Sequence, residues 1–305
     1  MARINVCTNL TNGVGLQRDY EMLRAELEKR GYEVNGIMWN AKEAPRADLN
    51  IFIELLNLGI FQRAPRQWAI PNPEWWFAGW DVNLPQIESV LCKTHDCERI
   101  FRGKGPKTRY IGWQARDLYR PEIQRERKVL HLAGKSHAKN TEAVVECWRR
   151  YSPEIDLTVV SEHFVGVGSR TSSYRRVTEE QLTLFLNSHL FHLLPSAYEG
   201  YGHAIHEAQA VGAILMTTDA APMDEAGAPV RLPSCRRRNA NHAPYFDVSP
   251  EAIRDGIERA LAMSEEEIRL ASEAARAKYE ADCAEFQASL NELFGKAIEL
   301  RAATA

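Results

Sequence analysis

The sequence predicts an α/β protein made of two Rossmann-like domains. Strand-like apolar runs alternate with helical patterns along the whole chain, which is the rhythm of parallel sheets covered by helices. The chain has 305 residues, a length that suits about two domains. In its second half, a glycine loop that carries two acids follows a strand, and doubly wound sheets bind ligands at such strand ends. We place the domains at 1–122 and 123–305.

The first half begins with a strand at 4–7, a loop and a helix at 16–30. Leu16, Tyr20, Leu23 and Leu27 recur at helical spacing, and Gly31 suits the C-cap of this helix. The prolines within 66–77 exclude a helix interior, so that segment is expected to be a strand followed by a loop. The other strands of this half are expected at 32–39, 49–56, 87–93 and 108–113.

Capping patterns mark the helices of the second half. Thr178 with Gln181 forms a capping-box pattern, as does Ser264 with Glu267, and Ser249 precedes a proline at a favoured N-cap position. Helices are therefore expected through 143–148, at 179–187, from 249 and over 264–303. Strands are expected at 128–134, 157–161, 190–194 and 213–218.

Composition narrows the class of protein. Hydrophobic residues make up 45% and charged residues 26%, which is typical of a soluble globular chain, and the N-terminus enters a strand pattern without a signal peptide. We expect a cytoplasmic protein with no transmembrane helix. A net charge of −3 argues against binding nucleic acid mainly through electrostatics. Basic residues still cluster at 102–109, 125–128 and 236–238, most simply as solvated loops.

The cysteines and several histidines favour structural roles. The six cysteines have no disulfide-framework spacing, so reduced thiols are expected. Cys92, His95 and Cys97 lie in what resembles a strand and turn, without a second Cys/His pair, so no metal site is expected there. Three histidines in apolar strand-like context are expected to be core residues: His131, His189 and His192.

The glycine loop at 199–207 carries the chemistry. Glu199, Gly200 and Gly202 precede a short helix that contains Glu207, and Gly212 ends that helix. A helix N-terminus and bare loop amides favour an anion, while the two carboxylates accept hydrogen bonds from sugar or ribose hydroxyls. From these residues alone, an ordinary strand–helix crossover with a solvated glutamate remains an equal alternative.

This stretch resembles the E-x7-E signature of retaining GT-B glycosyltransferases of the family-4 (group 1) type. Tyr201 stands where that family usually has Phe. The resemblance implies the GT-B fold, with an acceptor domain at 1–122 and a donor domain with C-terminal helices at 123–305 facing a central cleft. The matching residues are Pro195, Ser196, Glu199, Gly200, Gly202, Glu207, Ala208, Ala210 and Gly212.

The resemblance also implies the site's roles. Glu207 is expected to hold the ribose of a UDP- or GDP-linked sugar, and Glu199 to contact the transferred sugar. The leaving phosphate is expected to help accept the acceptor's proton, with no essential metal and no further cofactor. Donor contacts are also expected from the residues beside Glu199, namely Gly200, Tyr201, Gly202 and His203.

Two other loops are expected to meet the donor. Lys135 and Lys139 follow a strand, where the family places an arginine and a lysine on the diphosphate, so both are assigned to catalysis; a lysine in place of the arginine loses bidentate contact. Gly13, with Gly15, lies on the first strand–helix loop and allows close approach of the backbone. The alternatives are two surface lysines and a plain turn.

The motif at 71–76, PNPEWW, is expected on the acceptor side. Asn72 and Glu74 are candidates for contact with the acceptor, and Trp75, like Trp76 and Trp80, for stacking on a sugar or base. An equal alternative is a loop packed by its tryptophans.

Other functions compete with sugar transfer. A phosphorylase or an epimerase would keep the fold, but the chain is short for a phosphorylase and shows no convincing lysine for a pyridoxal cofactor. A catalytically degenerate nucleotide-sugar-binding protein is the main alternative. Glycan, lipid-linked glycan and metabolite all stay open as acceptors, as do a hydroxymethylated base in DNA as a minority reading and contact with a membrane surface.

Overall fold

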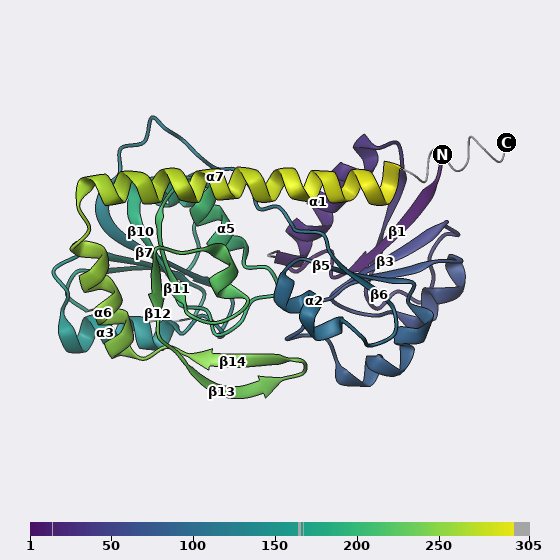
Figure 1. Ribbon diagram of the computed structural model, residues 1–305, viewed down its shortest axis with the longest axis horizontal. Coiled ribbons are helices and arrows are strands. Elements are labelled where there is room, and N and C mark those ends of the chain that lie inside the picture. The colour runs from purple at the N-terminus through teal and green to yellow at the C-terminus, as the bar shows by residue number, and fades with distance from the viewer. Residues whose placement is uncertain (14, 164–165, 167, 296–305) are drawn as a thin grey trace. The chain divides into compact units, whose positions relative to one another are not determined.

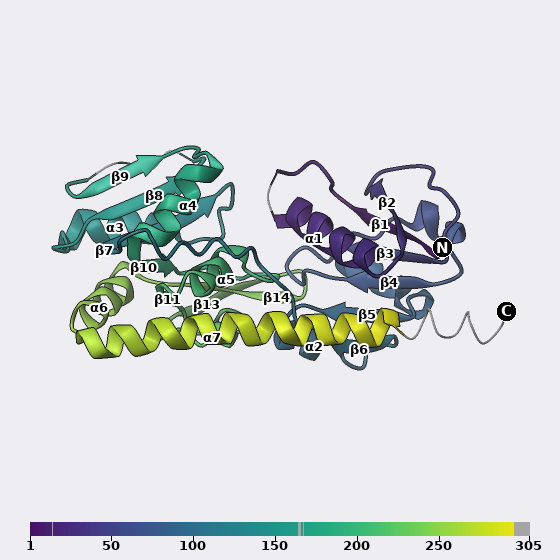
Figure 2. The same cartoon turned by 90° about the horizontal axis from the view of Figure 1, so that it is seen from above.

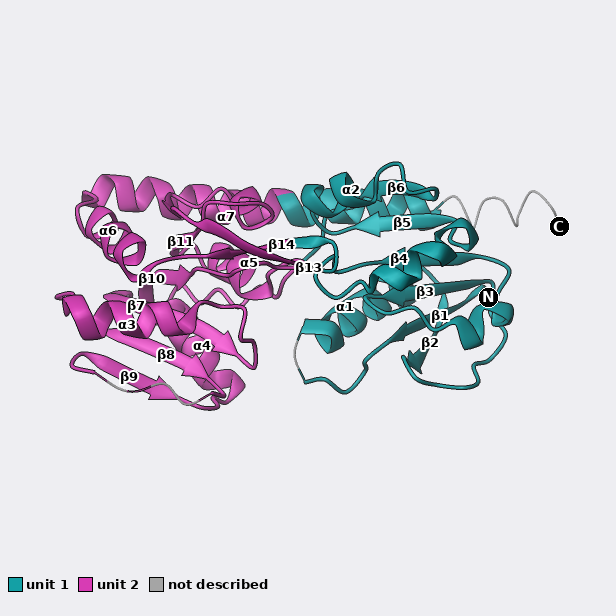
Figure 3. Ribbon diagram, turned by 90° about the horizontal axis from the view of Figure 1, so that it is seen from below, with its two compact units in different colours: residues 1–114, 240–243, 282–305 teal, residues 115–239, 244–281 magenta. Residues whose placement is uncertain are grey.

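The computed structural model describes residues 1–13, 15–163, 166 and 168–295, and they fall into two compact units (Figure 3). Unit 1 comprises 1–114, 240–243 and 282–305, and unit 2 comprises 115–239 and 244–281. Each unit contains a parallel six-stranded sheet with helices, as the alternating pattern predicts (Figure 1). Among the described residues, no helix has the length and apolar character needed to cross a membrane.

The sheet of unit 1 has the strand order β2-β1-β3-β4-β5-β6. Helix α1 (Gly15–Lys29) packs along β1, β2 and β3 (Figure 2). The strands are β1 (Arg3–Thr8), β2 (Glu33–Met38), β3 (Leu49–Ile53), β4 (Gln67–Ile70), β5 (Ser89–Cys92) and β6 (Lys107–Tyr110). The remaining helices are α2 (His95–Phe101) and the 3-10 helices η1 (Leu58–Arg63) and η2 (Ala78–Gln86).

Local sequence explains where these elements end. Leu16, Leu23 and Leu27 form the buried face of α1, and Gly31, with φ +82°, follows its last turn. Strand β3 stops at Ile53, earlier than predicted, because Glu54 has φ +70° and leaves the extended conformation.

The sheet of unit 2 has the order β12-β11-β10-β7-β8-β9. Its strands are β7 (Glu126–Gly134), β8 (Leu157–Ser161), β9 (Thr171–Tyr174), β10 (His189–Leu194), β11 (Ile214–Thr218) and β12 (Val230–Leu232), and a hairpin is formed by β13 (Cys235–Ala240) and β14 (Ala243–Asp247). The helices are α3 (Thr141–Tyr151), α4 (Glu179–Ser188), α5 (His203–Ala210), α6 (Pro250–Leu261) and α7 (Glu265–Leu290), with η3 (Met223–Ala226) and a final π-helical turn η4 (Asn291–Gly295).

Alternating residues of unit 2's strands build two separate cores. Val129, Phe191 and Ile214 belong to a cluster that includes residues of α3 and α6. Leu130 and Leu215 belong to the other cluster, which includes residues of α4 and α5. The sheet is therefore buried on both faces, as a doubly wound sheet requires.

The predicted helix caps are present, whereas the segment around 92–97 has a different secondary structure from the one predicted. Thr178 forms a full capping box at α4, Ser249 caps α6, and Ser264 exchanges hydrogen bonds with Glu267 at the start of α7. The strand and turn expected around 92–97 are instead the end of β5 and helix α2. The Thr94 hydroxyl accepts from the Cys97 amide and begins that helix. The predicted helix from 264 continues as α-helix to 290, and its last predicted residues lie outside those described.

Candidate functional site

The candidate site of unit 2 lies where the strand order of the sheet reverses. The chain runs outward from β7 to β8 on one side and from β10 to β11 on the other. The loops after β7 and β10 therefore share the switch point at which open α/β sheets bind ligands. These are the lysine loop at 135–140 and the glycine loop at 195–202.

Hydrogen bonds join these two loops. The amide of Ala197 donates to the carbonyl of Ala138 at 2.8 Å, and Asn140 Nδ2 donates to the carbonyl of Pro195 at 2.8 Å. Asn140 adopts the left-handed conformation with φ 49°, which asparagine tolerates. These two hydrogen bonds hold the glycine loop in a fixed position against the lysine loop.

The structure brings Lys139 and Glu199 together. Lys139 Nζ is paired with Glu199 Oε1, and the hydroxyl of Ser196 donates to the same oxygen at 2.5 Å. Both charged side chains are nearly covered, with 14% and 13% exposed. An ammonium and a carboxylate are therefore held side by side at the switch point.

Glu207 lies in α5 and is 2% exposed as a side chain. Arg116 Nε donates to Glu207 Oε1 at 2.9 Å, and Arg116 Nη1 donates to Glu179 Oε1 at 2.7 Å. Arg116 Nη2 is buried and makes no hydrogen bond within the described part of the chain. Sequence reasoning missed Arg116, although a glutamate among small apolar residues signals the need for a nearby cation.

Gly202 sets the geometry between the two acids. It has φ +89° and is the N-cap of α5. A Cβ at this position would lie 3.3 Å from Cγ of Glu199. Gly212, with φ +65°, follows the last turn of α5, as its position in the motif predicts.

Tyr201 and two histidines pack around the start of α5. The Tyr201 ring stacks on His206 with centroids 4.1 Å apart and contacts His203 edge-on at 5.2 Å. Desolvation of the His206 imidazole lowers its pKa to about 3, so the ring is neutral near pH 7. Tyr201 is 8% exposed, so it is chiefly a packing residue of the loop.

The remaining predicted site residues take no part in these contacts within unit 2. Lys135 Nζ is paired with Glu162 at 4.0 Å, and its side chain is 48% exposed. Gly13, with φ +71°, belongs to unit 1. The acceptor-side candidates also belong to unit 1: Asn72 and Glu74 are buried, while Trp75 is 60% exposed.

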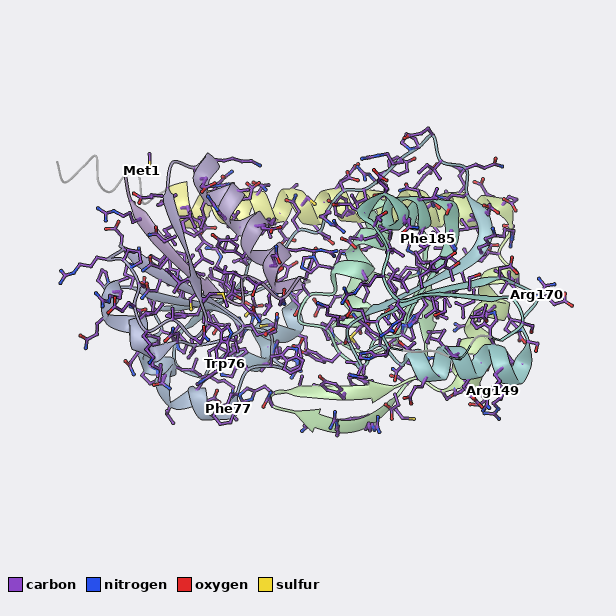
Figure 4. All side chains as sticks on the ribbon, turned by 180° about the vertical axis from the view of Figure 1, so that it is seen from behind. Met1, Trp76, Phe77, Arg149, Arg170 and Phe185 are labelled. Atoms are coloured by element: carbon purple, nitrogen blue, oxygen red, sulfur yellow. The ribbon has the colours of Figure 1, made fainter. Side chains whose placement is uncertain are left out.

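Of the other tryptophans of that loop, Trp76 is a core residue and Trp80 is partly buried against the same core. Trp76 is fully buried, its Nε1 donates to Asp81 Oδ1 at 2.9 Å, and its ring meets Trp80 edge-on, whereas neighbouring Phe77 is exposed (Figure 4). The loop of packed tryptophans is therefore the better description for Trp76 and Trp80.

The histidines expected in the core, His131, His189 and His192, are buried. No cysteine is in a disulfide, and no group of three or more His, Cys, Asp or Glu residues could hold a metal ion within the described ranges. His131 and His192 are fully buried, and burial lowers their pKa values to about 4 and about 3. His189 hydrogen-bonds Thr158 at 2.8 Å.

Comparison with known proteins gives a match at the level of structure. No protein-family model matches the chain, and no curated protein matches its sequence. Sucrose-phosphate synthase from Thermosynechococcus elongatus superimposes with a TM-score of 0.75 at 13% identity, over 98% of this chain and 100% of that one. Anabaena Alr3699/HepE in complex with UDP and glucose gives 0.68 at 12% identity, over 98% and 100%.

A third structure, trehalose-6-phosphate from E. coli bound with UDP-2-fluoro glucose, gives a TM-score of 0.66 at 10% identity over 96% of this chain and 99% of that one. Identities this low establish the fold alone. The chain therefore has the two-domain GT-B fold, with one Rossmann-like sheet in each unit, as the sequence predicts.

Proposed function

We propose that this protein is a retaining glycosyltransferase that moves a sugar from a nucleotide-diphosphate sugar to an acceptor hydroxyl. The observation that carries the proposal is the pair of acid–cation contacts at the switch point of unit 2, Lys139 with Glu199 and Arg116 with Glu207. UDP is the first nucleotide to test, because two structures of similar fold contain UDP or a UDP-sugar.

Each contact is assigned to one part of the donor. Glu207 accepts hydrogen bonds from the ribose hydroxyls, with Arg116 holding its carboxylate in place. The amides from Gly200 to His203 and the Lys139 ammonium offset the charge of the diphosphate. Glu199 then exchanges its contact with Lys139 for the hydroxyls of the transferred sugar.

The proposed reaction makes use of these contacts. The bond from the sugar's anomeric carbon to the diphosphate oxygen breaks, and a bond from the acceptor oxygen forms on the same face. The acceptor's proton goes to the departing phosphate. The cations of the chain stabilise the leaving diphosphate, so the proposal includes transfer without a divalent metal.

Nucleotide binding tests the proposal directly. Full-length protein is screened by thermal shift against UDP, GDP and ADP in EDTA, since a ligand stabilises the state that binds it. We expect one nucleotide to raise the melting temperature of the wild type and not of Glu207→Ala. Glu199→Ala should bind the nucleotide and lose turnover, and NMR of the product should show a retained anomeric configuration. Binding without turnover in the wild type would favour the degenerate binding protein.

A further inference from the structure

A second polar cluster lies in unit 1, at the carboxyl ends of neighbouring strands. Thr8 ends β1, Glu54 follows β3, Asn72 stands two residues beyond β4, and Lys93 follows β5. Parallel strands place such residues at one edge of the sheet, where this type of fold binds ligands. Asp19 of α1 completes what we call the edge cluster.

Contacts inside the edge cluster neutralise its lysine. Lys93 Nζ donates to Asp19 Oδ2 at 2.9 Å, with side chains 1% and 3% exposed. Trp113 Nε1 donates to the other oxygen of Asp19 at 2.7 Å. The carboxyl of Glu54 lies beside this ion pair, so the cluster holds more carboxyl groups than ammonium groups.

Two polar atoms of the edge cluster have no hydrogen-bond partner within the described residues. Asn72 Nδ2 donates to Glu54 Oε2 at 2.6 Å, but Asn72 Oδ1 is buried without a bond. The hydroxyl of Thr8 is likewise buried without a bond. The two residues are 7% and 0% exposed. Native proteins satisfy nearly all buried polar groups, so each unmet group requires an explanation.

A ligand hydroxyl would meet these unmet atoms. It can donate its one proton to Asn72 Oδ1 and accept a hydrogen bond from the hydroxyl of Thr8. Burial raises the pKa of Glu54, with Asn72 and Lys93 opposing the rise, so this carboxyl also lies in a partly desolvated polar setting. Lys93, the cation of the cluster, is paired with Asp19, so a phosphate group would meet the carboxyl of Glu54 without a free cation to offset its charge.

We propose that the edge cluster binds an uncharged sugar or similar polyol as the acceptor and discriminates against its phosphate ester. The assignment of the bound sugar as the acceptor rests on the proposed function. The proposal adds to that function the chemical class of the acceptor. The backbone amide of Trp75 donates to the Asn72 carbonyl at 3.0 Å, so the two residues share one turn. The exposed side chain of Trp75 offers an aromatic face for the sugar ring.

Matched sugar pairs test the proposal on the full-length protein. Glucose and fructose are compared with glucose 6-phosphate and fructose 6-phosphate, first for binding by ligand-observed NMR without nucleotide, then for release of UDP from UDP-glucose. We expect at least one free sugar to bind about ten-fold more tightly than its ester, a difference of 1.4 kcal/mol. Equal or tighter binding of the esters overturns the proposal, as does binding of neither member by protein that binds UDP.

Variants separate this proposal from the proposed function. Asn72→Ala should lose sugar binding about ten-fold and keep the UDP thermal shift, while Glu207→Ala should do the reverse. Asn40→Ala, at an exposed asparagine of unit 1, is the control. Thr8→Val keeps the side-chain shape, so it should fold and still weaken sugar binding. A purely structural role for Thr8 would leave sugar binding unchanged in this variant and would overturn the assignment.

Discussion

Arg116 forms an ion pair with the buried carboxylate of Glu207. Removing one partner of such a pair is costly because the other charge is left desolvated. We expect Arg116→Met to lower the free energy of unfolding by about 3 kcal/mol, measured by urea denaturation. Glu179→Ala removes the exposed contact of the same arginine and should change stability by less than about 1 kcal/mol. The double variant Arg116→Met/Glu207→Gln should recover much of the loss, and strict additivity would contradict the assigned contact.

The two lysines after β7 provide a direct comparison. Lys139 is paired with Glu199 at the switch point, and Lys135 is paired with the separate Glu162. We expect Lys139→Ala to weaken donor binding about ten-fold, or 1.4 kcal/mol. From the sequence, Lys135 and Lys139 are equally good candidates for contact with the diphosphate. We expect Lys135→Ala to change donor binding less than two-fold. Calorimetric titration of UDP into both variants decides between them, and a larger effect at Lys135 would reverse the assignment.

At the residue scale, the residues of a motif can be predicted from the sequence more readily than the side chains that contact the motif. Glu199 and Glu207 stand out because two acids and several glycines fall at fixed spacing in one short segment. Arg116 does not, because it is 91 residues from Glu207 in the chain and contacts it only after the fold forms. Lys139 and Lys135 are alike in sequence and differ only in what each side chain meets.

At the scale of elements, the loop before α5 depends on a left-handed glycine. Gly202→Ala should cost about 1–2 kcal/mol of stability through its positive φ and displace Glu199, whose Cγ lies 3.3 Å from the added Cβ. Gly31→Ala is a matched control, because φ is +82° there and no atom lies within 4 Å of the added Cβ. Both variants should lose similar stability by urea denaturation, and Gly202→Ala alone should lose donor turnover. Equal turnover in the two variants would show that the loop tolerates the change.

Elements with strong apolar patterns are predictable, and polar ones are not. β8 and α4 appear close to their predicted ranges, because β8 is a fully buried apolar run and α4 carries its capping box. β9, with the sequence TSSY, and β13, with CRRRNA, were missed because neither shows strand periodicity. α2 was missed because only seven residues follow its cap. These elements are determined by tertiary contacts rather than by local pattern.

At the scale of the whole molecule, buried histidines make stability depend on pH. The pKa of His131 falls to about 4 in the folded protein, and those of His192 and His206 fall to about 3, against about 6.5 when unfolded. The unfolded chain therefore binds more protons below about pH 6.5, so stability is lost as pH falls through this range. Three protons give a slope approaching about 4 kcal/mol per pH unit near pH 5. Urea denaturation from pH 7 to 4.5 should show this slope, and His192→Gln should remove about a third of it. A curve for this variant parallel to that of the wild type would contradict the prediction.

The discontinuity of unit 1 has a consequence for biosynthesis. Phe286 packs its ring against Trp113 at 5.1 Å, and Phe294 meets both Tyr32 and Trp68, so the far end of the chain supplies part of this unit's core. Most of unit 1 leaves the ribosome before unit 2, yet these aromatic rings follow unit 2 in the chain. The early segment therefore has apolar surface uncovered until unit 2 has been synthesised. We expect a chaperone to bind the nascent chain during this delay. The length of unit 2 sets how long the delay lasts.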